Sequence, residues 1–202
     1  IQNEFTGVLT GKGLSYGGSL IRPEATGYGA VYFAQQMLLK NKMDFQGLSV
    51  AISGSGNVAQ YVCEKVIELG GIPVSMSDSS GFIYDKDGID TDKLKFIKKL
   101  KNVKRGRIKE YAAQYNCEYY KDLKPWGIKC DVAFPCATQN ELDQSSAYEL
   151  VKNGVKCVTE GANMPTTPEA IEVFHKNNVL FSPGKASNAG GVATSGLEMS
   201  QN

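Results

Sequence analysis

Residues 48–59 read Leu-Ser-Val-Ala-Ile-Ser-Gly-Ser-Gly-Asn-Val-Ala, an apolar run that ends in a glycine-rich turn. The apolar run over Leu48–Ser53 predicts a strand, and the helical spacing of apolar residues over Val58–Leu69 predicts a helix. Gly54 permits a tight turn, Gly56 lets a ligand approach the backbone, and the small Ala59 lets the helix pack closely on the strand. The stretch therefore predicts a strand, a turn and a helix whose N-terminal N–H groups face the pyrophosphate of a dinucleotide.

This short glycine pattern alone also fits an ordinary tight turn between a strand and a helix. The flanking sequence favours the dinucleotide interpretation, because a second apolar run ends at Asp78, about 20 residues beyond the turn. An acidic residue at that distance commonly binds the adenosine ribose. The candidate cofactor-binding residues of the turn are Gly54, Ser55, Gly56, Asn57 and Val58.

The composition is that of an ordinary globular domain. The 202 residues are 42% hydrophobic, and the formal net charge is +1. This balance gives no general attraction to nucleic acid or to a membrane surface, and no apolar run is long enough to span a bilayer. The five cysteines are odd in number and lack C-x-x-C spacing, which indicates reduced thiols and a cytoplasmic location. Because the chain opens on Ile1 and closes on Asn202 within a helical pattern, we expect it to be part of a longer protein.

Apolar runs alternate with helical patterns along the chain, which predicts a parallel sheet with right-handed crossovers. The expected fold class is α/β, a doubly wound, mostly parallel, Rossmann-like sheet. We expect a leading segment and helix over 1–47 and a dinucleotide-binding domain over 48–202. The expected strands are Leu48–Ser53, Pro73–Ser77, Val132–Phe134, Lys156–Thr159 and Val179–Phe181, and the expected helices are Ala25–Lys40, Val58–Leu69, Asp92–Leu100, Ile108–Tyr115, Ser146–Asn153, Pro168–Lys176 and Gly190–Met199.

Polar loops follow the predicted strands. In a parallel sheet the carboxyl ends of the strands meet at one edge, and ligands bind there. We therefore expect a single crevice that collects the loops Ser53–Asn57, Ser77–Gly81, Pro135–Asn140, Glu160–Pro165 and Pro183–Gly191.

The residues around Asp78 bear on the choice of nicotinamide cofactor. An acid at the ribose normally favours NAD, because its charge opposes a 2′-phosphate. Ser79 and Ser80 follow, however, and a basic cluster comes after the next helix, where charge-assisted hydrogen bonds to a phosphate are expected. A solvated basic face is the alternative interpretation of that cluster. We favour NADP, with NAD possible; the candidate phosphate partners are Lys101, Lys104 and Arg107.

Two other groups of residues have simple interpretations. Asp85, Asp87, Asp90 and Asp92 lack the spacing of a calcium-binding loop, so we expect a solvated turn and no metal site. Cys136 lies in a predicted loop and could line a pocket, but no histidine is near it in sequence, so nothing marks it as a nucleophile.

Long runs of the sequence resemble the hexameric glutamate dehydrogenases. The similarity covers nearly the whole chain, and the runs Arg22–Gly29 and Pro135–Glu141 fit this family better than the related leucine and phenylalanine dehydrogenases. A non-catalytic nucleotide-sensing module is a further alternative. The runs that carry the resemblance are Thr10–Gly13, Gly17–Ser19, Arg22–Gly29, Ser53–Ala59, Pro135–Asn140, Glu160–Pro165, Asn188–Val192 and Ser195–Asn202.

The resemblance implies the reversible, NAD(P)-dependent deamination of L-glutamate to 2-oxoglutarate and ammonia, in a homo-hexamer. It implies that Thr26 holds the nicotinamide carboxamide, that Asn57 lies at the nicotinamide end and that Asn163 contacts a ribose. Ala137 and Thr138 belong to a nucleotide loop, and the Ser77–Ser80 segment is similar to that of the NADP-preferring branch. The implied substrate-binding residues are Ser195 for the distal carboxylate, Val192 for the carbon chain and Thr10.

The family's catalytic residues have no counterpart here. Its glycine-rich catalytic-lysine run and its catalytic aspartate belong to a substrate domain that is expected to lie outside this chain. Lys12 stands between glycines, but its run matches a later segment of the family. We therefore expect no catalytic residue in the chain, and we expect it to bind cofactor without turning over glutamate alone.

Overall fold

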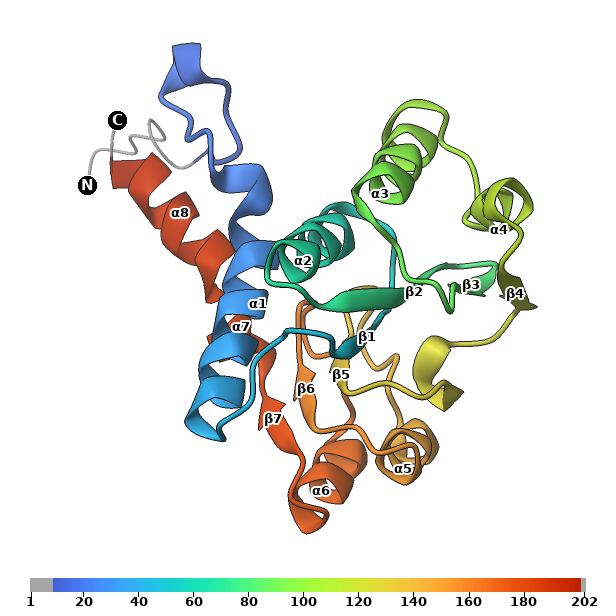
Figure 1. Cartoon of the computed structure of the whole chain (residues 1–202). Helices are drawn as coiled ribbons and strands as arrows, with labels where there is room; N and C mark the ends of the chain where they lie inside the picture. Colours follow the sequence, from blue (N-terminus) through green and yellow to red (C-terminus); the bar gives the residue numbers. More distant parts are fainter. Residues whose placement is uncertain (1–8, 201–202) are drawn as a thin grey trace.

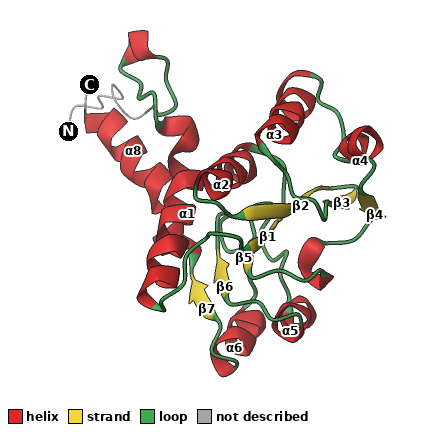
Figure 2. Ribbon diagram, in the orientation of Figure 1, coloured by secondary structure: helices red, strands yellow, loops and turns green. Residues whose placement is uncertain are grey.

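The computed structural model describes residues 9–200, so residues 1–8 of the expected leading segment, together with Gln201 and Asn202, lie outside the described residues. A sheet of seven strands runs through the molecule in the order β4-β3-β2-β1-β5-β6-β7. Helices cover both faces of this sheet (Figure 1). Coloured by secondary structure, the strands form one central layer between helices (Figure 2).

Five neighbouring strands are parallel. From β1 the chain moves outward to β2 on one side and later returns to β5 on the other, so the direction of winding reverses between β1 and β5. The prediction of a doubly wound, mostly parallel sheet is confirmed. The parallel strands are β1 (Ser49–Ile52), β2 (Ile72–Asp78), β5 (Val132–Phe134), β6 (Cys157–Thr159) and β7 (Leu180–Ser182).

Two antiparallel strands at one edge were not predicted from the sequence. β3 (Gly81–Tyr84) folds back on β2 through a two-residue turn, and β4 (Glu118–Lys121) pairs with β3. Each has only four residues, too few to show an alternating pattern. Contacts across the sheet hold them instead, for example the stacked rings of Phe82 and Tyr120, whose centroids lie 4.8 Å apart.

The expected helix Pro168–Lys176 is present with its predicted bounds, and the other six expected helices are present with shifted ends. Asp90, Asp143 and Thr167 each accept a backbone N–H bond at the start of a helix, which fixes where α3, α5 and α6 begin. A π-helical turn over Lys99–Val103 extends α3, and the short α7 was not predicted. The helices are α1 (Arg22–Lys40), α2 (Asn57–Glu68), α3 (Thr91–Lys98), α4 (Lys109–Tyr115), α5 (Gln144–Lys152), α6 (Pro168–Lys176), α7 (Gly184–Ser187) and α8 (Ala189–Ser200).

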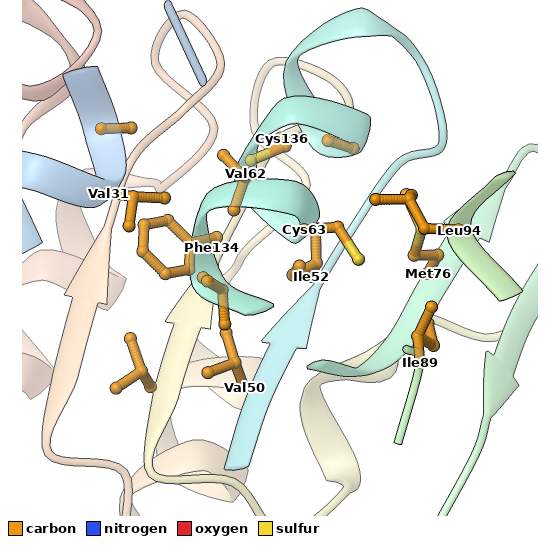
Figure 3. Close-up of a cluster of buried hydrophobic side chains, with 14 of the residues drawn as sticks. Val31, Val50, Ile52, Val62, Cys63, Met76, Ile89, Leu94, Phe134 and Cys136 are labelled. Atoms are coloured by element: carbon orange, nitrogen blue, oxygen red, sulfur yellow. The ribbon is translucent and has the colours of Figure 1, made fainter. Parts of the chain in front are cut away.

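The core has one hydrophobic layer on each face of the sheet. Alternation along β1 divides it, because Val50 and Ile52 pack into one layer and Ala51 into the other. Figure 3 shows part of the first layer, which includes Val62 of α2, Phe134 of β5 and Val50 of β1. Trp126, 2% exposed, packs in the second layer.

The expectation of a solvated turn at Asp85 is wrong. Asp85 is 3% exposed, and its Oδ2 accepts hydrogen bonds from Tyr111 Oη at 2.5 Å and from Lys93 Nζ at 2.8 Å. The acid is buried because these two partners, which follow it in sequence by 8 and 26 residues, fold back onto it. Over the described range 9–200, no group of three or more His, Cys, Asp or Glu residues could hold a metal ion.

The helices between Leu9 and Ser200 are not membrane spans, because none of them is both long and apolar enough to cross a bilayer.

Candidate functional site

Two cavities open at the carboxyl ends of the parallel strands, where the winding reverses. The first, here called the glycine-turn cavity, has a volume of about 540 Å³ and is bordered by the turn after β1 and the turn after β2. The second, the α8 cavity, has a volume of about 470 Å³ and lies between α1, α8 and the loop after β6. Ala137 lines both cavities. The predicted loops therefore do meet, but in two compartments that share one wall.

The glycine turn is shaped to receive a ligand. Gly54 has a φ of +79°, and a Cβ there would lie 3.0 Å from the carbonyl oxygen of Cys136, so only glycine fits without strain. A Cβ on Gly56 would meet nothing within 4 Å, because that position faces open space. Gly56 is also the N-cap of α2, and no side chain caps this helix end. Backbone N–H groups and the helix dipole thus favour an anion at this place.

Asp78 lines the glycine-turn cavity, but its carboxylate is already occupied. Oδ1 accepts bonds from the backbone N and the hydroxyl of Ser80, at 2.9 and 2.6 Å, and Oδ2 accepts from Ile108 N at 2.8 Å and Lys101 Nζ at 3.2 Å. Burial alone would raise the pKa of Asp78, but these bonds outweigh it and hold the pKa below the usual 3.8. The acid therefore closes the β2–β3 turn and fixes the segment before α4.

The three candidate phosphate partners differ in position. Arg107 donates from Nη1 to the hydroxyl of Ser79 at 2.7 Å, and Ser79 lines the glycine-turn cavity. Lys101 is held by Asp78 and by the carbonyl oxygen of Gly106. Lys104 is exposed and, in the described part of the chain, lines neither cavity. One cation thus bonds a residue that lines the cavity, a second is held by Asp78 and Gly106, and the third lines neither cavity.

Glu141 is a site residue that the sequence analysis missed. It is 5% exposed and lines the glycine-turn cavity together with Thr138. Its Oε1 accepts hydrogen bonds from Ser53 Oγ at 2.8 Å and Ala137 N at 2.9 Å. Burial raises the pKa of Glu141, although the bonds from Ala137, Ser53 and Thr138 act in the opposite direction. The sequence feature that could have indicated it is an acidic residue in a loop whose other residues are uncharged.

The α8 cavity gathers most of the residues assigned to the nicotinamide and the substrate. Thr26, Val58, Asn163, Val192 and Ser195 line it. Arg22 and Asn188 also line it and were not singled out from the sequence. Arg22 Nε donates to Ser195 Oγ at 2.9 Å, so a cation and a hydroxyl lie together at this wall. Asn188 Nδ2 donates to Asn163 Oδ1 at 3.1 Å, which orients the Asn163 amide.

Asn57 and Thr10, like the three candidate phosphate partners, lie outside both cavities. Asn57 donates from Nδ2 to the carbonyl oxygen of Pro23 at 2.6 Å, so its amide ties α2 to the start of α1. Thr10 is exposed in the segment before α1. Glu198 of α8 holds this segment by accepting bonds from Gly11 N at 2.8 Å and Ser19 N at 2.9 Å.

Cys136 lines the α8 cavity, as its loop position suggested, but it is 8% exposed. Burial raises the pKa of the Cys136 thiol well above its ordinary value, and the charge of Glu141 adds to this effect. The thiol therefore acts as a small packing group beside Val62 (Figure 3).

The chain is similar in sequence to known proteins. A family model described as "Glutamate/Leucine/Phenylalanine/Valine dehydrogenase" matches residues 17–202. An NAD(P)-specific glutamate dehydrogenase of Xylanibacter ruminicola is 61% identical over 202 residues, which are 100% of this chain and 46% of that protein. The NADP-specific glutamate dehydrogenase of Escherichia coli is 55% identical, over 100% of this chain and 45% of that protein.

A solved structure shows the same fold. The crystal structure of Plasmodium falciparum glutamate dehydrogenase superposes with a TM-score of 0.94 and 49% sequence identity, over 100% of this chain and 44% of that one. The chain thus spans about half the length of the relatives that it matches.

Proposed function

This chain belongs to the glutamate/leucine/phenylalanine/valine dehydrogenase family, and on that premise we propose that it forms the dinucleotide-binding part of an NADP-dependent glutamate dehydrogenase. The reaction would be the reversible oxidative deamination of L-glutamate to 2-oxoglutarate and ammonia. The observation that carries the proposal is the pair of cavities that share Ala137 at the reversal between β1 and β5.

Each half of the cofactor has a cavity that suits it. The uncapped start of α2 and the open space beside Gly56 favour the pyrophosphate at the edge of the glycine-turn cavity. The adenosine ribose would then lie near Asp78 and Ser79, and the nicotinamide would cross the wall at Ala137 into the α8 cavity. Thr26 and Asn163 supply polar groups there for the carboxamide and the second ribose.

The surroundings of Asp78 support NADP as the preferred cofactor, with NAD possible. An acid that discriminates for NAD must accept hydrogen bonds from the ribose, but both oxygens of Asp78 already accept bonds from the protein. Ser79 and Arg107, joined at 2.7 Å, offer a hydroxyl and a guanidinium at the rim instead, and both suit a 2′-phosphate. Close relatives are named NADP-specific or NAD(P)-specific enzymes.

The α8 cavity favours glutamate over an apolar amino acid. Arg22 and Ser195 lie together at its wall, and a guanidinium beside a hydroxyl is suited to a second carboxylate. Val192, 73% exposed, offers an apolar surface for the carbon chain. An apolar substrate side chain would bring no carboxylate to the Arg22 guanidinium.

In this mechanism the chain orients the reactants. Bound nicotinamide would supply the hydride acceptor, while Thr26 and Asn163 fix its position and Arg22 and Ser195 hold the distal end of the substrate. The groups that transfer protons are proposed to lie in a substrate domain outside these 202 residues. Exposed apolar side chains on the segment before α1 and on α8 support that arrangement, because they offer a surface on which another domain can pack. They are Leu9, Leu14, Tyr16, Leu20, Ile21, Leu197 and Met199.

Cofactor titration followed by enzyme assay tests the proposal. We expect NADPH to bind this chain more tightly than NADH, with an affinity that falls as salt is added, because ionic contacts are screened. The full-length protein should oxidise L-glutamate with NADP far faster than it oxidises leucine. Tight nucleotide binding without turnover by the full-length protein would favour the nucleotide-sensing alternative instead.

The proposal also covers the oligomeric state and the cellular compartment of the full-length enzyme. We propose a homo-hexameric, cytoplasmic full-length enzyme; one solved structural neighbour is itself titled a hetero-hexameric glutamate dehydrogenase. Light scattering of the full-length protein after gel filtration measures the subunit number, and a monomeric mass would contradict this part.

A further inference from the structure

Glu141 joins two segments that border the cofactor cavities. Its Oε1 accepts bonds from Ser53 Oγ and Ala137 N, and the same Ser53 hydroxyl accepts a bond from Cys136 N at 2.8 Å. The end of β1 and the loop after β5 are therefore connected through one carboxylate. Because Ala137 lines both cavities, this carboxylate sets the position of the wall between them.

The same residue lines the cavity at whose edge the pyrophosphate is proposed to bind. Glu141 is 5% exposed and lines the glycine-turn cavity, so little water screens its charge. An ionised carboxylate and an anionic ligand in one low-dielectric cavity repel each other, and a bound proton on the carboxylate removes the repulsion. A ligand that brings negative charge should therefore favour the protonated form.

The other ionisable groups around Glu141 leave that repulsion in place. Lys124 Nζ donates to the backbone carbonyl oxygen of Glu141 at 2.6 Å, and its charge partly stabilises the ionised carboxyl. Asp78 and Asp122 also line the cavity, and the charge of Glu141 helps to raise the pKa of the Cys136 thiol. Burial outweighs the effect of Lys124, so the pKa of Glu141 is raised even before a ligand enters.

We propose that Glu141 is a positioning residue that couples cofactor binding to the uptake of one proton. It holds Ala137 and Thr138 in place for the dinucleotide, and its carboxylate takes a proton from solvent when the pyrophosphate enters the cavity. Proton and charge balance, because one carboxylate and one solvent proton become one carboxylic acid. This inference rests on the proposed function, since it needs a dinucleotide in that cavity.

Calorimetric titration in buffers of different ionisation enthalpy tests the coupling, because it counts the protons taken up on binding. NADPH and NADH are both titrated into the wild-type chain and into E141Q, between about pH 5 and pH 8, where a carboxyl of raised pKa titrates. The 2′-phosphate of NADPH itself titrates near pH 6, as phosphate monoesters do. NADH lacks that group, so the difference between wild type and E141Q with NADH isolates Glu141.

We expect Glu141 to contribute a fraction of one proton to the uptake on binding. The uptake by E141Q should be smaller than that of wild type by this fraction. For NADH, the wild-type affinity should fall as pH rises, by at most about tenfold per pH unit for one linked proton, whereas that of E141Q should be nearly flat. S53A, which removes a bond but keeps the carboxylate, should bind more weakly and still take up the proton.

Glu160→Gln is the matched control. Glu160 is also buried, at 4% exposure, and accepts backbone bonds from Thr166 at 3.2 Å and Gly184 at 2.5 Å, but it lines neither of the two cavities. E160Q should therefore keep the wild-type proton uptake. If E141Q fails to fold, K124M replaces it, because loss of this cation should move the uptake to higher pH.

The outcomes separate the two proposals. Failure of the wild-type chain to bind either nucleotide would contradict the proposed function. Binding with equal proton uptake in wild type and E141Q, or with no shift in K124M, would overturn the role of Glu141 and leave the proposed function standing.

Discussion

At the scale of single residues, the two glycines of the turn have separable tasks. Gly54 has the left-handed φ of +79° and touches the backbone of Cys136, so it is required by the fold. Gly56 has an ordinary φ of −80° and faces open space, so the fold alone would accept a side chain there. Its glycine is explained by the proposed ligand.

The pair of variants G54A and G56A tests this distinction. We expect G54A to lower the free energy of unfolding by about 1–3 kcal/mol, the cost of a strained left-handed residue. G56A should keep the wild-type stability and lose NADPH affinity, because its methyl group projects into the space for the pyrophosphate. Urea denaturation and fluorescence titration measure the two effects, and wild-type affinity in G56A would contradict the proposed position of the pyrophosphate.

Asp78 gives a prediction about pH. Its pKa is lower in the folded protein than the usual 3.8, so its ionised form stabilises the fold above that value. The stability is lost as pH falls through the lower, folded pKa. D78N should therefore cost about 1–3 kcal/mol at pH 7, the penalty for unpaired buried donors, and clearly less in acid. Urea denaturation at several pH values measures this, with S80A as a control that removes one bond but keeps the charge.

At the scale of elements, α8 both lines the α8 cavity and anchors the segment before α1. Ser195 faces the cavity, while Glu198, fully buried, accepts bonds from Gly11 and Ser19. α1 packs along the same helix, and Figure 1 shows the two side by side. The same helix thus positions Ser195 at the cavity and holds the segment before α1 in place.

Glu198→Ala tests the anchoring role of α8. We expect amide hydrogen exchange to become faster at Gly11 and Ser19, whose N–H groups lose their acceptor, and to stay unchanged in β1. Glu149→Ala, at an exposed position of α5, serves as the control and should leave both regions unchanged. Unchanged exchange at Gly11 in E198A would show that other contacts hold the segment.

At the scale of the whole molecule, the proposed cofactor would bridge the two halves of the sheet. The glycine-turn cavity borders β1 and β2, the α8 cavity borders the β6 side, and Ala137 on the loop after β5 belongs to both. A ligand that fills both cavities binds the folded state and not the unfolded state, so it stabilises the fold by mass action.

We therefore expect NADPH to raise the thermal midpoint of the chain. At a concentration of about 100 times Kd, the gain in the free energy of unfolding should be about 2.7 kcal/mol. Differential scanning calorimetry measures it. NADPH at the same concentration should shift G56A much less, and an equal shift in both proteins would place the nucleotide elsewhere.

The local sequence determined much of this fold. The runs over Leu48–Ser53 and Pro168–Lys176 predict a strand and a helix because periodicity and capping act over a few residues. The glycine turn, the parallel order and the loops that meet at one edge follow from the same local signals. The resemblance to a family added the assignment of roles to residues such as Thr26 and Ser195.

Only the tertiary structure decided which groups meet. From the sequence, Asp78, Lys101 and Arg107 are candidate cofactor ligands. In the folded chain the carboxylate of Asp78 accepts hydrogen bonds from Lys101 and Ile108, and Arg107 donates to Ser79. Glu141 meets Ser53 across 88 positions, and Arg22 meets Ser195 across 173. The edge strands β3 and β4 likewise depend on pairing with β2. Burial and long-range pairing set the charge and availability of each group, and neither is encoded in the neighbouring residues.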